Sequence, residues 1–267
     1  MVAIACASVT LTPDSARLDG TIALVTGAAV GIGRASAVTL AAFGADVGIC
    51  DRDEENLMTC AAEIEALGGR VFPGLLDVRD GDQVRAWVDG AASACGPIDV
   101  VVNNAGGGFV CEFLTVNDKG QDALVRENFT SVTNVVRAAV PHMPSTGGSI
   151  INITSIEAHR AAPGFAVYSA MKAAVANLTQ TLALELGARN IRVNCIAPDV
   201  IPTPGIGEVP VRTPLSRAGH VDDIAAAVVF LANPALSGFI TGTTLHVDGG
   251  NRAAGGWHRM ADGSFTT

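Results

Sequence analysis

Tyr168 and Lys172 are the pair of side chains in this sequence best suited to move a proton. Both lie in Tyr168-Ser169-Ala170-Met171-Lys172, and a separation of 172 − 168 = 4 residues places them on the same face of a helix. A phenol with an ordinary pKa of about 10 is a poor acid or base at neutral pH. A neighbouring ammonium would stabilise the phenolate and bring this pKa toward the working range. The spacing therefore predicts an acid–base pair centred on the single tyrosine of the chain.

Two further polar residues are candidates for the same site. Ser155 directly follows an apolar run, 168 − 155 = 13 residues before Tyr168. Its hydroxyl is suited to hold a substrate oxygen as charge develops, and a loop or helix-capping serine is the alternative. Asn128 lies inside a helical pattern, although asparagine is a mediocre helix former. We interpret it as binding a water that links Lys172 to solvent, with a surface asparagine as the alternative.

A glycine turn follows the first predicted strand, in Thr26-Gly27-Ala28-Ala29-Val30-Gly31-Ile32-Gly33. Glycines permit unusual dihedrals and close backbone approach, and the N-terminus of the next helix presents free N–H groups to a pyrophosphate. An ordinary strand-to-helix turn is the alternative. The position on the first strand of a βαβ unit nevertheless favours dinucleotide binding in a Rossmann fold. We predict that the cofactor contacts Gly27, Gly31, Ile32 and Gly33.

Asp51 ends the second predicted strand, about 20 residues after the glycine turn. A carboxylate at this place accepts hydrogen bonds from the adenosine ribose and repels a 2′-phosphate. Because Val30 puts no basic residue beside the glycines, the pattern favours NAD over NADP. Arg52 is the observation against this choice, and a helix-capping role for Asp51 is the alternative.

Two later strand ends are predicted to complete the cofactor site. Asp77, followed by Val78, comes after the third strand and is suited to hold the adenine amino group. Asn104, Ala105 and Gly106 follow the fourth strand, where the backbone must pass close to the cofactor. A simple turn is the alternative at each place.

Short apolar runs alternate with longer segments of helical period from Thr21 onward. The predicted strands are 21–26, 46–50, 71–76, 98–103, 148–154, 191–196 and 243–247. The predicted helices are 31–43, 54–67, 81–95, 120–143, 166–187 and 221–232. Nearly continuous apolar strands are typical of a parallel sheet that helices cover on both faces. We therefore predict an α/β, Rossmann-type doubly wound fold with a seven-stranded parallel sheet.

We expect one Rossmann-fold domain over residues 18–250, after a flexible extension at 1–17 and before a tail at 251–267. The proline-rich segment 198–219 and the Gly-rich tail from Gly249 are predicted to be irregular. Irregular segments on a rigid scaffold often carry substrate recognition. Trp257 and Phe265 suggest that the tail packs near the substrate entrance.

Composition excludes several classes of partner. With 17 Lys and Arg against 26 Asp and Glu, the net charge is -9 and no basic run is present, so we expect no nucleic acid. Six cysteines without a CxxC pair and five histidines without ligand spacing predict no metal and a reduced, cytoplasmic protein. No segment approaches membrane-spanning length, so no membrane partner is expected.

Taken together, TGAAVGIG, NNAG, Asn128, Ser155, YSAMK and the segment 198–203 resemble the short-chain dehydrogenase/reductase family in its small single-domain branch. The resemblance covers about residues 18–250. It implies a catalytic tetrad of Asn128, Ser155, Tyr168 and Lys172, in which Tyr168 exchanges the proton and Lys172 also binds the nicotinamide ribose. It further implies that Pro198, Ile201 and Thr203 hold the nicotinamide carboxamide, that Asp199 replaces a usual glycine, and that the chain forms a homotetramer.

These observations predict an oxidoreductase that transfers a hydride between NAD and a secondary alcohol or ketone, such as a steroid-like, alicyclic or 3-hydroxyacyl compound. An NADPH-dependent 3-oxoacyl thioester reductase, acting on acyl carrier protein or coenzyme A thioesters, is one alternative. A catalytically silent NAD-binding protein is another, and the lack of GxSxG disfavours a serine hydrolase. Candidates for the apolar pocket wall are Phe109, Phe113, Met143, Phe165 and Val200.

Overall fold

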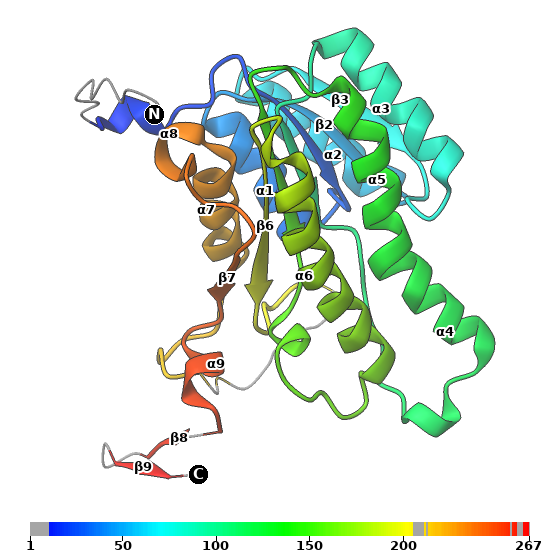
Figure 1. Ribbon diagram of the computed structural model, residues 1–267, viewed down its shortest axis with the longest axis vertical. Helices are drawn as coiled ribbons and strands as arrows, with labels where there is room; N and C mark the ends of the chain where they lie inside the picture. Colours follow the sequence, from blue (N-terminus) through cyan, green and yellow to red (C-terminus); the bar gives the residue numbers. More distant parts are fainter. Residues whose placement is uncertain (1–10, 205–210, 212, 257, 261–263, 267) are drawn as a thin grey trace.

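The computed structural model describes residues 11–204, 211, 213–256, 258–260 and 264–266, and its main feature is a seven-stranded parallel sheet (Figure 1). The strand order is β3-β2-β1-β4-β5-β6-β7. The strands are β1 Ile22–Thr26, β2 Asp46–Asp51, β3 Val71–Leu75, β4 Val100–Asn103, β5 Gly148–Ile153, β6 Ile191–Pro198 and β7 Thr244–Val247. This arrangement confirms the predicted doubly wound α/β fold, because the chain moves outward from β1 in both directions.

Helices cover both faces of the sheet and bury two apolar clusters against it. One cluster joins the strands to α1, α2 and α7, and the other joins them to α3, α5 and α6. Alternate residues of β1 serve the two faces, since Ala23 and Val25 lie in the first cluster and Ile22 and Leu24 in the second. The helices are α1 Gly31–Ala42, α2 Glu54–Ala66, α3 Gly81–Cys95, α4 Asp118–Val125, α5 Ser131–Ala139, α6 Ala166–Gly187 and α7 Val221–Ala232.

The predicted helix 120–143 is interrupted in the structure. A π turn, Arg126–Thr130, separates α4 from α5, and a 3₁₀ turn, Val140–His142, follows. The prediction of one continuous helix was therefore wrong in detail. Asn128 lies at the centre of the π turn, where its Nδ2 donates to the Leu124 carbonyl at 2.9 Å. A widened turn of this kind often marks a functional site, and hydrophobic periodicity does not reveal it.

The segments beyond the strand ends are only partly as predicted. The described residues within 199–219 contain neither helix nor strand, in agreement with the sequence. The tail is more regular than predicted, because it forms α9, Asn251–Ala254, and the antiparallel strands β8, His258–Arg259, and β9, Phe265–Thr266. Figure 1 shows this hairpin extending beyond the end of β7, away from the sheet. Trp257, the proposed anchor of the tail, lies outside the described residues.

At the other end of the chain, a 3₁₀ turn, Pro13–Ala16, lies beside α8, Pro234–Ser237 (Figure 1). Asn233 Nδ2 donates to the carbonyls of Ser15 and Arg17 at 2.9 and 3.1 Å. The flexibility of residues 1–17 stays a prediction. No helix in the described part of the chain has the length and apolar character needed to cross a membrane.

Candidate active site

Tyr168 and Lys172 lie in α6, which follows the carboxyl end of β5. The Lys172 ammonium is 5.6 Å from the centroid of the Tyr168 ring, as the four-residue spacing predicts. Its Nζ donates to the Ile153 carbonyl at 3.0 Å, and the residue is only 5% exposed. Burial lowers the pKa of Lys172 to about 8. Because this ammonium loses its proton far more readily than an exposed one, it is suited to a proton relay.

Ser155 follows β5 and meets the phenol of Tyr168. Ser155 lies close enough to the phenol to lower the pKa of Tyr168, and its hydroxyl accepts from the Glu157 N–H at 3.1 Å, capping the 3₁₀ turn Ile156–Ala158. Ser155 therefore caps this turn, and its role in holding a substrate oxygen stays a prediction. Burial raises the pKa of Tyr168 above its ordinary value, while Ser155 lowers it and the Glu157 carboxylate raises it. A cation near the phenol is needed to bring this pKa down.

Asn128 is fully buried, which excludes the surface alternative. Its Nδ2 donates to the Gly107 carbonyl at 2.8 Å, and its Oδ1 accepts from the Gly107 N–H at 3.2 Å. These bonds fasten the loop after β4 to the π turn. A Cβ built on Gly106 would lie 2.8 Å from Asn128 Oδ1 and 3.1 Å from Lys172 Nζ, so any larger residue would have to displace one or both of these side chains.

The glycine turn forms a cradle in which side chains have no room. A Cβ on Gly33 would lie 2.0 Å from the Gly27 carbonyl oxygen, and one on Gly27 would lie 2.9 Å from Asn104 Nδ2. Gly27 and Gly31 have positive φ angles of 67° and 61°. A Cβ on Gly31 would lie 3.1 Å from Thr203 Cγ2, so the loop after β6 closes on the turn. Ile32 lies between Gly31 and Gly33 at the start of α1, as predicted.

Asn104 fixes this cradle from the neighbouring strand. Its Nδ2 donates to the carbonyls of Thr26 and Gly27 at 3.1 and 3.0 Å. The backbone N–H groups of Asn104 and Ala105 donate to Thr26 Oγ1 at 3.1 and 3.0 Å. Sequence reasoning did not assign a role to Thr26, although its position directly before the first glycine was a usable signal. The motif after β4 therefore holds the turn after β1 in place.

Asp51 lies beside the glycine turn, as expected. Its Oδ2 accepts from the Ala29 N–H at 3.0 Å, and its Oδ1 accepts from the N–H groups of Arg52 and Asp53 at 2.7 and 3.2 Å. Asp53, rather than Asp51, caps α2, so the helix-capping alternative is excluded. The Arg52 guanidinium lies 3.6 Å from the Glu127 carboxylate. It therefore already has an anionic neighbour.

Asp77 and Val78 follow β3, and Asp77 is paired with a residue that the sequence did not single out. Arg79 Nε lies 2.9 Å from both Asp77 oxygens, and this ion pair lowers the pKa of the carboxyl. Val78 is buried, and its carbonyl accepts from Asn134 Nδ2 at 3.2 Å. The Asp77 carboxylate, which was predicted to bind adenine, is therefore already ion-paired with Arg79.

The segment after β6 carries the remaining predicted residues. Pro198 ends the strand, Ile201 is 4% exposed, and Thr203 meets Gly31. Asp199 directs its carboxylate to Asn251, whose Nδ2 donates at 2.6 Å, and lies 3.8 Å from Arg160. Sequence reasoning missed both partners. Glu157 and Arg160 are three residues apart and come shortly after Ser155, and this spacing was a usable signal for their ion pair of 2.7 Å.

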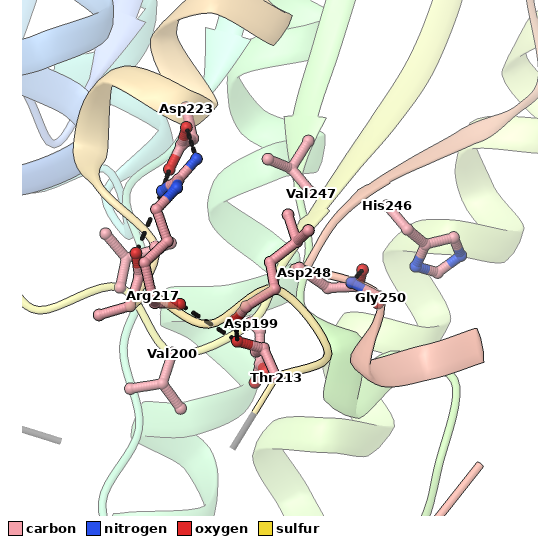
Figure 2. Close-up of a pocket in the computed structure, with 14 residues that line it drawn as sticks. Asp199, Val200, Thr213, Arg217, Asp223, His246, Val247, Asp248 and Gly250 are labelled. Carbon is pink, nitrogen blue, oxygen red and sulfur yellow. Dashed lines mark hydrogen bonds and ion pairs between the residues drawn. The ribbon is translucent and has the colours of Figure 1, made fainter. Parts of the chain in front are cut away.

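Two hollows lie at this end of the sheet. The groove that contains Tyr168 is apolar, and Phe109, Phe113 and Phe165 line it as predicted. Met143 does not contribute, because it is buried in the core beside Gly148 at the start of β5. A larger cavity of about 300 Å³ lies between the loops after β6 and β7 (Figure 2), with Val200 in its wall. Tyr168 lines the groove and is absent from the lining of the larger cavity.

The described residues contain no group of three or more His, Cys, Asp or Glu that is placed to hold a metal ion. The sheet, the cradle and the Tyr–Lys pair instead form a dinucleotide-type site with an acid–base centre. Sequence comparison agrees. Residues 27–252 match the family described as enoyl-(acyl carrier protein) reductase.

Characterised relatives cover nearly the whole chain. The 3-oxoacyl-(acyl-carrier-protein) reductase FabG of Thermotoga maritima is 39% identical, covering 88% of this chain and 98% of that protein. A solved 7α-hydroxysteroid dehydrogenase complexed with NADH and 7-oxo-glycochenodeoxycholic acid has a TM-score of 0.86 and 35% identity, covering 90% of this chain and 98% of the other. Carveol dehydrogenase from Mycobacterium avium, complexed with NAD, has a TM-score of 0.82 and 30% identity, covering 87% and 98%.

The chain belongs to the short-chain dehydrogenase/reductase family. It is an oxidoreductase of alcohol and ketone groups, and solved structures of similar proteins contain NAD, NADH or NADPH. The prediction of the family is confirmed.

Proposed function

We propose that this protein transfers a hydride between NAD and a secondary alcohol or ketone, with Tyr168 as the acid–base group. The observation that carries the proposal is the position of the Tyr168 side chain: it lies close to Ser155, and the centroid of its ring is 5.6 Å from the buried Lys172 ammonium. This arrangement lets one phenol exchange a proton with a substrate oxygen that Ser155 holds.

The cradle at the carboxyl end of the sheet fits a dinucleotide. Gly27, Gly31 and Gly33 leave space that a Cβ would fill, and the first turn of α1 offers its N–H groups to a pyrophosphate. Ile32, Val78, Ala105 and Gly106 would contact the cofactor through the backbone, Lys172 would bind the nicotinamide ribose, and Pro198, Ile201 and Thr203 would hold the carboxamide. When bound, NAD supplies the site that accepts or releases the hydride.

Asp51 supports NAD over NADP. Its carboxylate is held beside the glycine turn by the Ala29 N–H, so it stands where an adenosine ribose binds in a Rossmann fold. A 2′-phosphate there would meet a fixed negative charge. Arg52 is not an unpaired cation that could attract the phosphate, because the Glu127 carboxylate lies 3.6 Å from its guanidinium.

An NADPH-dependent 3-oxoacyl thioester reductase is the second candidate, and the 39% identity to FabG favours it. The exposure of the Arg52 side chain, 57%, also leaves that residue within reach of a phosphate. A silent NAD-binding protein is disfavoured by the intact Tyr168, Lys172 and Ser155 arrangement.

The test is a turnover screen with NAD, NADP, NADH and NADPH against alicyclic and steroid-like alcohols, sugars, and 3-oxoacyl thioesters, followed at nicotinamide absorbance. We expect NAD-linked alcohol oxidation in the wild type. Tyr168→Phe should reduce turnover at least about a hundredfold and keep NAD affinity, because it removes only the proton-transfer group. Near-normal turnover in this variant would refute the assigned chemistry.

We also propose a homotetramer, with α4, α5, α6 and the segment 221–250 at two-fold interfaces. A cytoplasmic location and a role for the tail in covering the substrate entrance stay predictions.

A further inference from the structure

Asp199 places a carboxylate where the family usually has glycine. The backbone does not require glycine there, because Asn190 is the only non-glycine residue with positive φ in the described part of the chain. Aspartate at this position is therefore unstrained, and its side chain is only 10% exposed. A nearly buried carboxylate needs partners to offset its desolvation.

The partners come from two different segments at the carboxyl end of the sheet. On one side, Asn251 Nδ2 of α9 donates to Asp199 Oδ2 at 2.6 Å. On the other, the Arg160 guanidinium lies 3.8 Å from Asp199 Oδ1 and donates to Glu157 at 2.7 Å. Glu157 in turn lies close enough to Tyr168 to influence its pKa. One carboxylate thus connects the loop after β6, the segment after Ser155, and the start of the tail.

A second carboxylate fastens α9 independently. Asp248 accepts from the Gly250 N–H at 2.9 Å and from the Arg252 N–H at 2.8 Å, so the helix is tied to the end of β7. Figure 2 shows Asp199, Asp248 and Gly250 gathered on the loops beyond β6 and β7, in the wall of the larger cavity. Loss of Asp199 would therefore release the link between α9 and the catalytic side without detaching α9 from the sheet.

We propose that Asp199 is a positioning residue for substrate affinity: it holds Arg160 and Glu157 in place beside Tyr168 and couples them to Asn251 of the tail. The inference rests on the proposed function, because it concerns the substrate of that reaction. Asp199 lines the larger cavity and makes no described contact with Tyr168, Ser155 or Lys172, so we expect its loss to change KM rather than kcat.

The test compares three variants with the wild type, using NAD and the secondary alcohol that is oxidised fastest in the turnover screen. Asp199→Ala removes the carboxylate, and Asp199→Gly also adds backbone freedom. The double exchange Asp199→Asn with Asn251→Asp keeps a hydrogen bond and a carboxylate between the two positions. We expect both single variants to raise KM about tenfold, which is the size of effect that the loss of a hydrogen bond to a charged group produces. The kcat and the Kd of NAD should stay within about twofold of the wild-type values. The exchange should recover most of the loss.

Hydrogen–deuterium exchange of the cofactor-free protein supplies a reading independent of activity. The amides of 250–254 and 156–160 should exchange faster in Asp199→Ala and return toward wild type in the double exchange. An unchanged KM in an active Asp199→Ala enzyme would overturn the inference, and so would parallel losses of kcat, NAD affinity and melting temperature, which indicate a general structural role. If the wild type itself oxidises no alcohol with NAD or NADP, the proposed function fails first and the inference falls with it.

Discussion

Lys172→Met should make the folded protein more stable near neutral pH while it removes catalysis. The Lys172 ammonium is buried, and burial lowers its pKa from 10.5 to about 8. In the unfolded chain the same lysine keeps its proton up to its ordinary pKa. Between these two values the unfolded state binds more protons, so the stability of the wild type rises with pH through this window.

The magnitude follows from the size of the shift. At 1.36 kcal/mol for each pKa unit, the burial of the charge costs about 3 kcal/mol at pH 7 and about 1.4 kcal/mol at pH 9.5. The variant avoids this cost, but it leaves the Ile153 carbonyl without its 3.0 Å partner, which costs roughly 1–3 kcal/mol at every pH. The carbonyl contribution cancels when the two pH values are compared. The advantage of the variant should therefore shrink by about 2 kcal/mol between them.

The assay is urea unfolding of the wild type and Lys172→Met at both pH values. Lys119, the other lysine of the chain, is exposed on α4 and provides a matched control, since Lys119→Met should show the same small difference at each pH. If Lys172→Met changes the free energy of unfolding by the same amount at the two pH values, the reasoning is refuted, because burial of the Lys172 ammonium would then not destabilise the folded state.

Three further predictions concern the cofactor cradle and the assembly. Asp51→Ala should weaken the affinity for NAD about tenfold in a fluorescence titration, because it removes one hydrogen-bond acceptor for the ribose. It should also reduce the preference for NAD over NADP, because one negative charge is lost. A wild type that already prefers NADP would contradict this prediction. Gly33→Ala should lower unfolding stability by roughly 1–3 kcal/mol, because its Cβ would meet the Gly27 carbonyl at 2.0 Å. The control Gly187→Ala, with nothing within 4 Å of the new Cβ, should be neutral or slightly stabilising in the same unfolding curves. Light scattering should give four chains per particle, and a monomer at micromolar concentration would rule out the tetramer.

The strands of the sheet were predictable because strands that are buried on both faces consist mainly of consecutive apolar residues. β1 is almost continuously apolar, and its observed bounds, Ile22–Thr26, differ by one residue from the prediction. The glycine turn and the Tyr168–Lys172 pair were predictable for a similar reason. In each case the residues that form the feature lie close together in the sequence.

The π turn at Asn128 was not predictable in the same way. Val125, Phe129, Val132 and Val136 keep a helical spacing across the turn, so the sequence period shows no break. The turn depends on a contact far away in sequence, between Asn128 and Gly107. Likewise, the link between Asp199 and Asn251 joins residues 52 positions apart, and neither residue predicts the other.

Gly106 shows how closely the cofactor cradle and the proton-transfer pair are joined. It belongs by sequence to the motif after β4, whose Asn104 holds the glycine turn through the carbonyls of Thr26 and Gly27. In space, the Cβ that Gly106 lacks would fall between Asn128 Oδ1 and Lys172 Nζ. A side chain there would displace the lysine on one side and strain the loop that carries Asn104 on the other. Cofactor binding and acid–base chemistry therefore depend on one backbone position, and a loss of both from a single substitution at Gly106 need not mean that the protein has unfolded.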